Sequence, residues 1–455
     1  MTIVPRKKTF HILVYILLVS MLFAVTACGS NNIANSGTDK SVTEPKQTST
    51  DTPATDKAEK APEKKVAVSF WNGFTGPDGD LLKQIVDEYN QNNTDNVEVK
   101  MDIMPWDQLF QKLPPSIATQ TGPNLVAMWP GAARPYIENK TFLSLDDFFT
   151  VTGADKAGFT ESSLEFGQGR TGTQYMLPMQ TNGIYLFWNK KLFKDAGLDP
   201  EKPPATLDEL VEFAIKITDL SKNQFGMALP VKGSPLHFIP FLKGNGGDVV
   251  DTVNLKSVLN SPENIATLTW LQDLAKNKKV SPAGATGADM DKLMLSGQLG
   301  MFITGPWLVG GLKANNIDFG VSVPPAGSKS QFIEVDGIGF SIPEGTTEEQ
   351  KNAAYMFIKY WSSEEIVKKW SLANGFPPFL EKVLSDPEIQ ADPIVSAMSA
   401  MGNTGEPFLK GLITADRINL DVLWPMIEAI QAGQDVTQVV KKASDDIDKI
   451  LQTEP

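Results

Sequence analysis

Cysteine and histidine are almost absent from this sequence of 455 residues, which has one Cys and two His. A single Cys cannot form a disulfide within the chain, and these counts exclude a zinc centre built from several Cys and His side chains. His11 lies in an N-terminal segment that we expect to be removed, which leaves His237 as the only imidazole for a Ser-His-Asp triad. Most hydrolytic and redox chemistries are therefore disfavoured, and we expect neither a metal nor a cofactor.

An excess of basic residues is also missing. The chain has 41 Lys and Arg against 54 Asp and Glu, which gives a formal net charge of −13. Binding to a phosphate backbone depends on cationic side chains that release counterions, so we expect no nucleic-acid partner. Hydrophobic residues make up 41% of the chain, which is enough for large cores, and the length predicts two to four domains or one large bilobal body.

The N-terminus has the pattern of an export signal. Three basic residues precede an apolar run over residues 10–27, and a small residue stands before the Cys. This order predicts a signal peptide over residues 1–27. The sequence Val25-Thr26-Ala27-Cys28 resembles the lipobox of bacterial lipoproteins, and the resemblance implies that Cys28 carries a lipid and becomes the mature N-terminus. The alternatives are an ordinary signal peptide with an incidental Cys, or an uncleaved anchor helix.

Residues 28–65 are predicted to be the lipidated Cys followed by a flexible tether. Six acidic residues balance six lysines in residues 29–65, and large aliphatic residues are rare, so the segment cannot bury enough apolar surface to fold. No other stretch of the chain is long and apolar enough to span a bilayer. We therefore expect a protein held on the extracytoplasmic face of the cell membrane by its lipid alone.

The remainder of the chain alternates between strand and helix patterns. Val66, Val68 and Phe70 alternate as in a strand, apolar residues recur at helical spacing over 81–89, and alternation returns over 97–103. A short buried strand over 124–128 follows, so the order predicts an α/β fold with a parallel sheet. Further helices are predicted over 206–217, from 262, over 347–361 and over 423–451, and two prolines should break or kink a helix over 107–119.

Tryptophan is the most informative residue type. Trp71 and Trp129 each close a predicted strand, and Trp106 and Trp307 each follow a proline in a loop. An aromatic ring beneath the flat C–H face of a sugar is what a carbohydrate site needs, although packing in a core is an equally simple role. His237 is either a ligand donor or an ordinary loop residue. The acidic run around Asp291 is interpreted as a solvated helix face.

Five stretches carry a family resemblance: residues 68–73 (VSFWNG), 122–129 (GPNLVAMW), 177–179 (LPM) continuing to 188–190 (WNK), 300–307 (GMFITGPW) and 423–425 (LWP). With the lipobox and tether, they resemble the extracellular solute-binding proteins of bacterial ABC importers, in particular the sugar-binding group that includes the maltodextrin-binding proteins. The resemblance implies a two-lobed periplasmic-binding-protein fold of type II, with the ligand in a cleft between the lobes. It also implies a membrane permease pair with its ATPase as partners, and a monomeric receptor.

The family fold implies lobe boundaries. Lobe one would hold residues 66–180 and 337–374, and lobe two would hold residues 183–334 and 377–455. The chain would cross between lobes near 179–183, 336–338 and 374–377, where a Gly in each segment suits a hinge.

The same resemblance implies site residues. Trp129, Trp307 and Trp424 match the aromatic plates of the maltodextrin binders, and Asn72 and Gly73 match the first ligand-facing loop. The charged rim of those relatives is replaced here by Ala132-Ala133, Asn182 and Phe74-Thr75, which disfavours maltose itself and favours another glycan held by amides. Further candidates, placed by their loops or hinges, are Trp71, Asp78, Trp106, His237, Asp336, Asn374 and Arg417.

The residues therefore favour a lipid-anchored, non-enzymatic receptor for a carbohydrate, most consistent with an oligosaccharide. A receptor for a non-sugar solute such as a glycerophosphodiester is one alternative. A surface-anchored glycoside hydrolase or lyase is another, because its two carboxylates are defined by a distance that the sequence does not supply.

Overall fold

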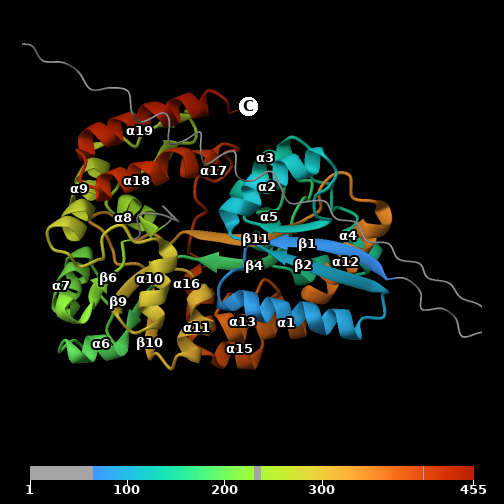
Figure 1. Ribbon diagram of the computed structural model, residues 1–455, viewed down its shortest axis with the longest axis horizontal. Coiled ribbons are helices and arrows are strands. Elements are labelled where there is room, and N and C mark those ends of the chain that lie inside the picture. Colours follow the sequence, from blue (N-terminus) through green and yellow to red (C-terminus); the bar gives the residue numbers. More distant parts are fainter. Residues whose placement is uncertain (1–64, 230–236, 403, 455) are drawn as a thin grey trace, which may run out of the picture. The chain divides into compact units, whose positions relative to one another are not determined.

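The computed structural model describes residues 65–229, 237–402 and 404–454, and the signal and tether predictions lie outside these ranges. The described residues belong to one compact unit, Pro62–Pro455. Two separate β-sheets organise this unit, and each is covered by helices (Figure 1). We call the part built on the five-stranded sheet lobe one and the part built on the four-stranded sheet lobe two. This mixed α/β architecture confirms the predicted fold class.

The sheet of lobe one has the strand order β2-β1-β3-β11-β4. Strand β1 pairs in parallel with β2 and β3 as predicted, whereas β11 is antiparallel to β3 and β4. The strands are β1 Val66–Asn72, β2 Val97–Ile103, β3 Leu125–Met128, β4 Leu177–Gly183 and β11 Val335–Ser341.

Alternation along the strands of lobe one directs side chains into two cores. Val68 and Phe70 of β1 pack against helices α1, α12 and α13, whereas Trp71 packs on the opposite face against α2 and α3. Figure 1 shows α1 and α13 on one side of the sheet and α2 and α3 on the other. The helices of this part are α1 Pro77–Asn92, α2 Trp106–Ala118, α3 Pro130–Glu138, α4 Phe148–Thr152, α5 Glu161–Glu165, α12 Glu348–Trp361, α13 Glu364–Asn374, α14 Glu381–Leu384 and α15 Pro387–Ala391. Helix α16 Pro393–Gly402 follows them and contacts both sheets.

Lobe two has the strand order β10-β5-β9-β6 and a separate two-stranded ribbon of β7 and β8. Its strands are β5 Tyr185–Asn189, β6 Phe225–Met227, β7 Val250–Asp251, β8 Lys256–Ser257, β9 Leu299–Thr304 and β10 Phe319–Ser322. Its helices are α6 Lys190–Asp195, α7 Leu207–Ile217, α8 Ile239–Gly244, α9 Pro262–Lys276, α10 Gly287–Leu295, α11 Val309–Ala314, α17 Ala415–Ile418, α18 Trp424–Gln431 and α19 Val436–Leu451, with a 3-10 turn η4 at Pro306–Leu308 and a π-helical turn η5 at Asn419–Leu423.

Several predicted helices are confirmed by their capping residues. Thr347 and Gln350 form a complete capping box at the start of α12, and the side chain of Ser261 accepts a hydrogen bond from Asn264 N at the start of α9. Pro77 occupies the first turn of α1, where its missing N–H removes no helical hydrogen bond.

One local prediction needs correction. The helix predicted over 423–451 is two helices, because Gly433 adopts a left-handed conformation (φ 89°) between α18 and α19. Of the break or kink predicted at Pro114 and Pro115, the break does not occur, since both prolines lie within the span of α2, and the kink stays a prediction.

The chain passes directly between the two sheets. Strand β4 of lobe one ends at Gly183 and β5 of lobe two begins at Tyr185, and the chain returns between β10 and β11. The core of lobe one also contains Phe379, Ile389 and Val395, from a segment that the sequence predicts for lobe two. That boundary, and the role of the crossings as hinges, stay predictions.

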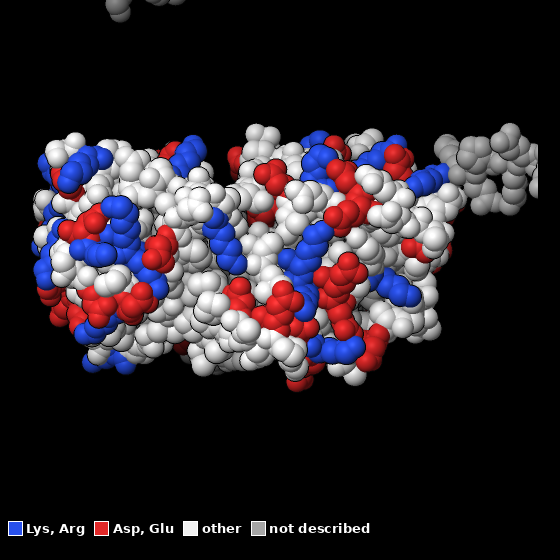
Figure 2. Space-filling view, turned by 90° about the horizontal axis from the view of Figure 1, so that it is seen from below, with Lys and Arg blue, Asp and Glu red and all other residues white. Residues whose placement is uncertain are grey.

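The described surface mixes charges of both signs. On the face shown in Figure 2, Lys and Arg side chains alternate with Asp and Glu side chains. Many of these charges pair along one helix, as Lys441 does with Asp445, and such exposed pairs contribute little to stability. Among the described residues, no helix combines the length and apolar character needed to cross a membrane.

Candidate functional site

Trp129 connects the two lobes through a hydrogen bond. It precedes α3 at the end of β3, and its Nε1 donates to Asp416 Oδ1 at 3.0 Å, in α17 of lobe two. Burial raises the pKa of Asp416 above its ordinary range, and the hydrogen bond from Trp129 acts against that rise. Arg417 rather than its neighbour Asp416 was a candidate from the sequence, because no local pattern indicates a partner 287 residues away.

The indole of Trp129 is held by an aromatic cluster of lobe one. Its ring lies edge-to-face on Phe110, with centroids 4.5 Å apart, and on Trp106 at 5.3 Å. Phe74 contacts Trp106 in turn at 5.6 Å. Trp106 also covers Gly73, where an added Cβ would fall 2.0 Å from the indole, so only glycine permits this packing. Phe110 was not a candidate from the sequence, and Phe74 was named there only as the replacement of a charged residue, yet both pack in this cluster.

Trp307 lies where the lobes meet. It forms part of η4, after β9, and packs against the cores of lobe one and lobe two. Helices α1 and α13 of lobe one both contact η4. An added Cβ at Gly305 would lie 1.9 Å from the Trp307 ring, so this tryptophan also packs directly on a glycine.

Several buried polar atoms near these tryptophans have no hydrogen-bond partner within the described part of the chain. Asn72 and Asn374 are 0% and 2% exposed, and each has an unpartnered Nδ2. The Oδ1 of Asn72 accepts from Phe74 N at 3.2 Å, which directs the amide from the end of β1. Unpartnered atoms also include Thr304 Oγ1 and Trp424 Nε1. Since buried polar groups are normally satisfied, these atoms are suited to a hydroxyl-bearing ligand.

Several carboxyl groups of the same region are partly or fully buried, and their pKa values are raised. Burial raises the pKa of Asp78, in the first turn of α1, to about 7, and it does the same for Asp336 in β11. The pKa of Glu334 is raised well above its usual value by burial and by Asp336. Asp291 was expected on a solvated face, but burial and the charge of Asp78 raise its pKa to about 7.

Four predicted residues have other surroundings. Trp71 packs in the core behind β1 and donates through Nε1 to Asp102 at 3.0 Å. His237 is buried in lobe two and stacks on Phe302. Asn182 of β4 accepts from Gln180 at 2.9 Å, and Arg417 is exposed and contacts Asp421 and Thr453.

Two other kinds of site are not supported by the described residues. Within their ranges, no group of three or more His, Cys, Asp or Glu side chains could hold a metal ion. A surface depression of about 840 Å³ lies on lobe two near α6 and α7, but it is lined by exposed charges such as Lys191 and Asp219 and by no aromatic side chain. The aromatic and amide groups near Trp129 and Trp307 are therefore the stronger candidate.

Comparison with known proteins gives a matching family and several relatives that bind solutes. The sequence model of a family described as bacterial extracellular solute-binding protein matches residues 84–397. A maltotriose-binding protein of Pyrococcus abyssi is 27% identical over 72% of this chain and 70% of its own length. The sn-glycerol-3-phosphate-binding periplasmic protein of Escherichia coli K12 is 23% identical over 68% of this chain and 74% of its own length.

A solved structure shares the fold. An ABC transporter solute-binding protein from Thermotoga lettingae, bound with α-D-tagatose, superposes with a TM-score of 0.77 at 22% identity. The match covers 85% of this chain and 99% of that one. The two-lobed arrangement of this chain is thus the one seen in periplasmic binding proteins.

Proposed function

Because this chain belongs to the bacterial extracellular solute-binding proteins, we propose that it is the substrate-binding component of an ABC importer. In this proposal it captures a carbohydrate, most consistent with an oligosaccharide, and delivers it to a membrane permease and its ATPase. It acts as a monomeric receptor rather than an enzyme, without a cofactor, on the extracytoplasmic face of the membrane. The maltotriose-binding relative supports the choice of a sugar.

The observation that carries the proposal is the pairing of aromatic rings with unsatisfied amides. Trp129 and Trp307 offer flat apolar faces, and Asn72 and Asn374 each have a buried N–H group without a partner among the described residues. Sugars need this combination, because their C–H faces stack on aromatic rings while their hydroxyls accept hydrogen bonds.

Capture would proceed by closure of the lobes. A ligand that touches both lobes stabilises the closed state more than the open one, so it shifts the population toward closure. Trp129 of lobe one and Trp424 of lobe two would contribute from opposite sides, and Trp307 from the junction. The predicted crossings near 179–183, 336–338 and 374–377 would act as hinges.

A phosphorylated polyol is the second candidate ligand. The sn-glycerol-3-phosphate-binding relative favours it. The carboxyls of Asp336 and Asp416 disfavour it once they ionise, because a carboxylate beside an anionic phosphate would repel it.

Thermal unfolding of residues 62–455 with a ligand panel tests the proposal. The panel contains maltotriose, tagatose, ribitol and sn-glycerol 3-phosphate, and only a ligand of the folded state raises the midpoint. We expect a concentration-dependent rise with a carbohydrate and no release of reducing sugar from oligosaccharides over the same period. A rise with sn-glycerol 3-phosphate alone would contradict the carbohydrate assignment, and sugar release would favour a hydrolase.

Lipid attachment at Cys28 is a separate proposal, which rests on the lipobox resemblance. When the full chain is expressed in a bacterium fed with labelled palmitate, we expect label in the protein and recovery in the membrane fraction. Cys28→Ser should abolish the label and release the protein from the membrane, because in this proposal the lipid on Cys28 is the only anchor. Label retained in Cys28→Ser would contradict this assignment.

A further inference from the structure

A second polar contact joins the two lobes, and its residues are distant in sequence from Trp129. Arg170 lies in the loop after α5 of lobe one, and Glu454 follows α19 of lobe two. Arg170 Nη2 donates to Glu454 Oε1 at 3.0 Å, and the side chain of Glu454 is only 2% exposed. A carboxylate buried to this degree and paired across the lobes is not a typical solvated surface charge.

Glu454 is fixed in place by lobe two itself. Its two carboxylate oxygens accept from Ile413 N at 2.9 Å, from Thr414 N at 3.0 Å and from Thr414 Oγ1 at 2.8 Å. These groups stand immediately before α17, the helix that carries Asp416. Glu454 therefore fixes the start of the helix whose aspartate binds the Trp129 indole.

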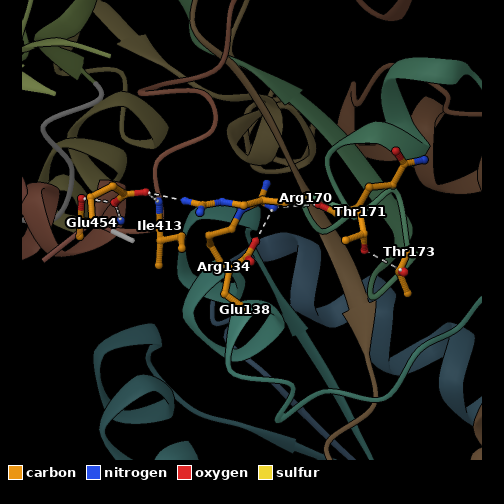
Figure 3. Close-up of polar contacts among 9 residues, drawn as sticks. Arg134, Glu138, Arg170, Thr171, Thr173, Ile413 and Glu454 are labelled. Carbon is orange, nitrogen blue, oxygen red and sulfur yellow. Dashed lines mark hydrogen bonds and ion pairs between the residues drawn. The ribbon is translucent and has the colours of Figure 1, made fainter. Parts of the chain in front are cut away.

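Arg170 is supported from lobe one in a corresponding way. Arg134, in α3, donates through Nη1 to Gln168 O at 2.8 Å and contacts Glu138 at 3.5 Å, which ties the loop of Arg170 to the helix that begins after Trp129. Figure 3 shows Arg134 and Glu138 beside Arg170, which points toward Glu454 and Ile413. Arg170 is thus tied to α3, and Glu454 is tied to the start of α17. These are the same elements that meet through Trp129 and Asp416.

We propose that Arg170 and Glu454 form a latch that favours the closed state of the two lobes. Glu454 is the positioning residue, since it holds α17 so that Asp416 meets Trp129, and Arg170 is the arm that reaches it from lobe one. The inference rests on the lobe closure of the proposed function and not on the identity of the ligand. Latch and ligand would then stabilise the same closed state, so a weaker latch would shorten the time that the ligand stays bound.

Ligand-free residues 62–455 test the latch by fluorescence energy transfer. The only Cys of the chain, Cys28, is outside this unit, so dyes attach specifically at Gln91→Cys in lobe one and Val253→Cys in lobe two, where Val253 is 89% exposed. Arg170→Gln removes the arm and leaves the bonds from Glu454 to residues 413 and 414. We expect it to lower the closed-to-open ratio by roughly 3- to 10-fold, the range for a charge-assisted contact.

Comparison of variants separates a latch from a structural cap. Glu454→Gln should lower the ratio at least as much as Arg170→Gln, and the double variant should match Glu454→Gln alone, because both changes break one contact. Lys441→Gln, which removes an exposed pair on α19, is the matched control and should leave the ratio unchanged. With maltotriose as probe, the latch variants should dissociate faster at an unchanged association rate.

Three results would overturn the latch. They are a wild-type chain without a closed population, additive effects in the double variant, and an effect of Glu454→Gln with none of Arg170→Gln. The last would make Glu454 only a cap of α17. Since the ratio is measured without ligand, failure of maltotriose to bind would count against the proposed function and not against the latch.

Discussion

Trp307→Ala is expected to weaken carbohydrate binding by roughly 30- to 150-fold, which corresponds to about 2–3 kcal/mol. The indole lies in η4 at the junction of the lobes and packs against the cores of both. Its removal would take away a stacking face and also loosen the contact that closure forms. The carbohydrate with the largest rise in unfolding midpoint serves as the ligand, and calorimetry measures its affinity.

The same packing means that Trp307→Ala also lowers the free energy of unfolding, by about 1–3 kcal/mol for a partly buried large side chain. Trp270→Ala is the matched control, because Trp270 is partly buried in the core of lobe two against Phe241 and has no contact with lobe one among those described. It should lower stability by a similar amount and leave affinity unchanged. Equal affinity losses in the two variants would show that Trp307 acts through stability and is not part of the site.

Much of the fold could be predicted because its signals are local. The alternation of Val66, Val68 and Phe70 and the capping pattern at Thr347 depend on residues a few positions apart, and both elements form where the pattern predicts them. The antiparallel partner β11 could not be predicted in this way, because strand order is decided by contacts between distant segments. The helix break at Gly433 has a local cause, but a single glycine within an apolar-periodic stretch is also compatible with a continuous helix.

The candidate site shows the same difference between local and long-range signals. Trp129, Trp307 and Asn72 became candidates through short sequence motifs that match the family, and such motifs are local. Asp416 and Glu454 were not, because their roles depend on partners on the other lobe, 287 and 284 residues away. Asp291 was misread since a run of acidic residues looks solvated in sequence, and only the packing of α10 near Asp78 buries it.

Asp336→Asn is expected to raise the stability of the protein at pH 8 and to flatten its dependence on pH. Burial raises the pKa of Asp336 from 3.8 to about 7, with opposition from the hydrogen bond donated by Gly337 N and a further rise from Asp416. Between about pH 4 and pH 7 the folded protein therefore keeps a proton that the unfolded chain has lost. The contribution of Asp336 to the free energy of unfolding is fully present below pH 4 and is lost as the pH rises through 7.

The size of this change in stability follows from the rise in the pKa of Asp336. A difference of about three pKa units corresponds to at most about 4 kcal/mol at pH 8, and partial exposure of Asp336 reduces it. Asn keeps an Oδ1 that can accept from Gly337 N, at 2.8 Å in the wild type, but it does not ionise. The variant should match the wild type at pH 4 and exceed it in free energy of unfolding at pH 8, as measured by urea denaturation.

Neighbouring buried acids should change the stability with pH in the same direction as Asp336. The control is therefore an acid at an exposed position. The pKa values of Asp78, Glu334 and Asp416 are also raised by burial, so the wild type should lose stability steeply from pH 4 to pH 8 and Asp336→Asn should remove only one share of that slope. Asp318→Asn, at an exposed position, should leave the slope unchanged. An unchanged slope in Asp336→Asn as well would mean that water reaches this carboxyl in the folded protein. The junction of the lobes would then contain water. A sugar that stacks on aromatic rings must lose its water there, so such a junction would not suit a sugar site.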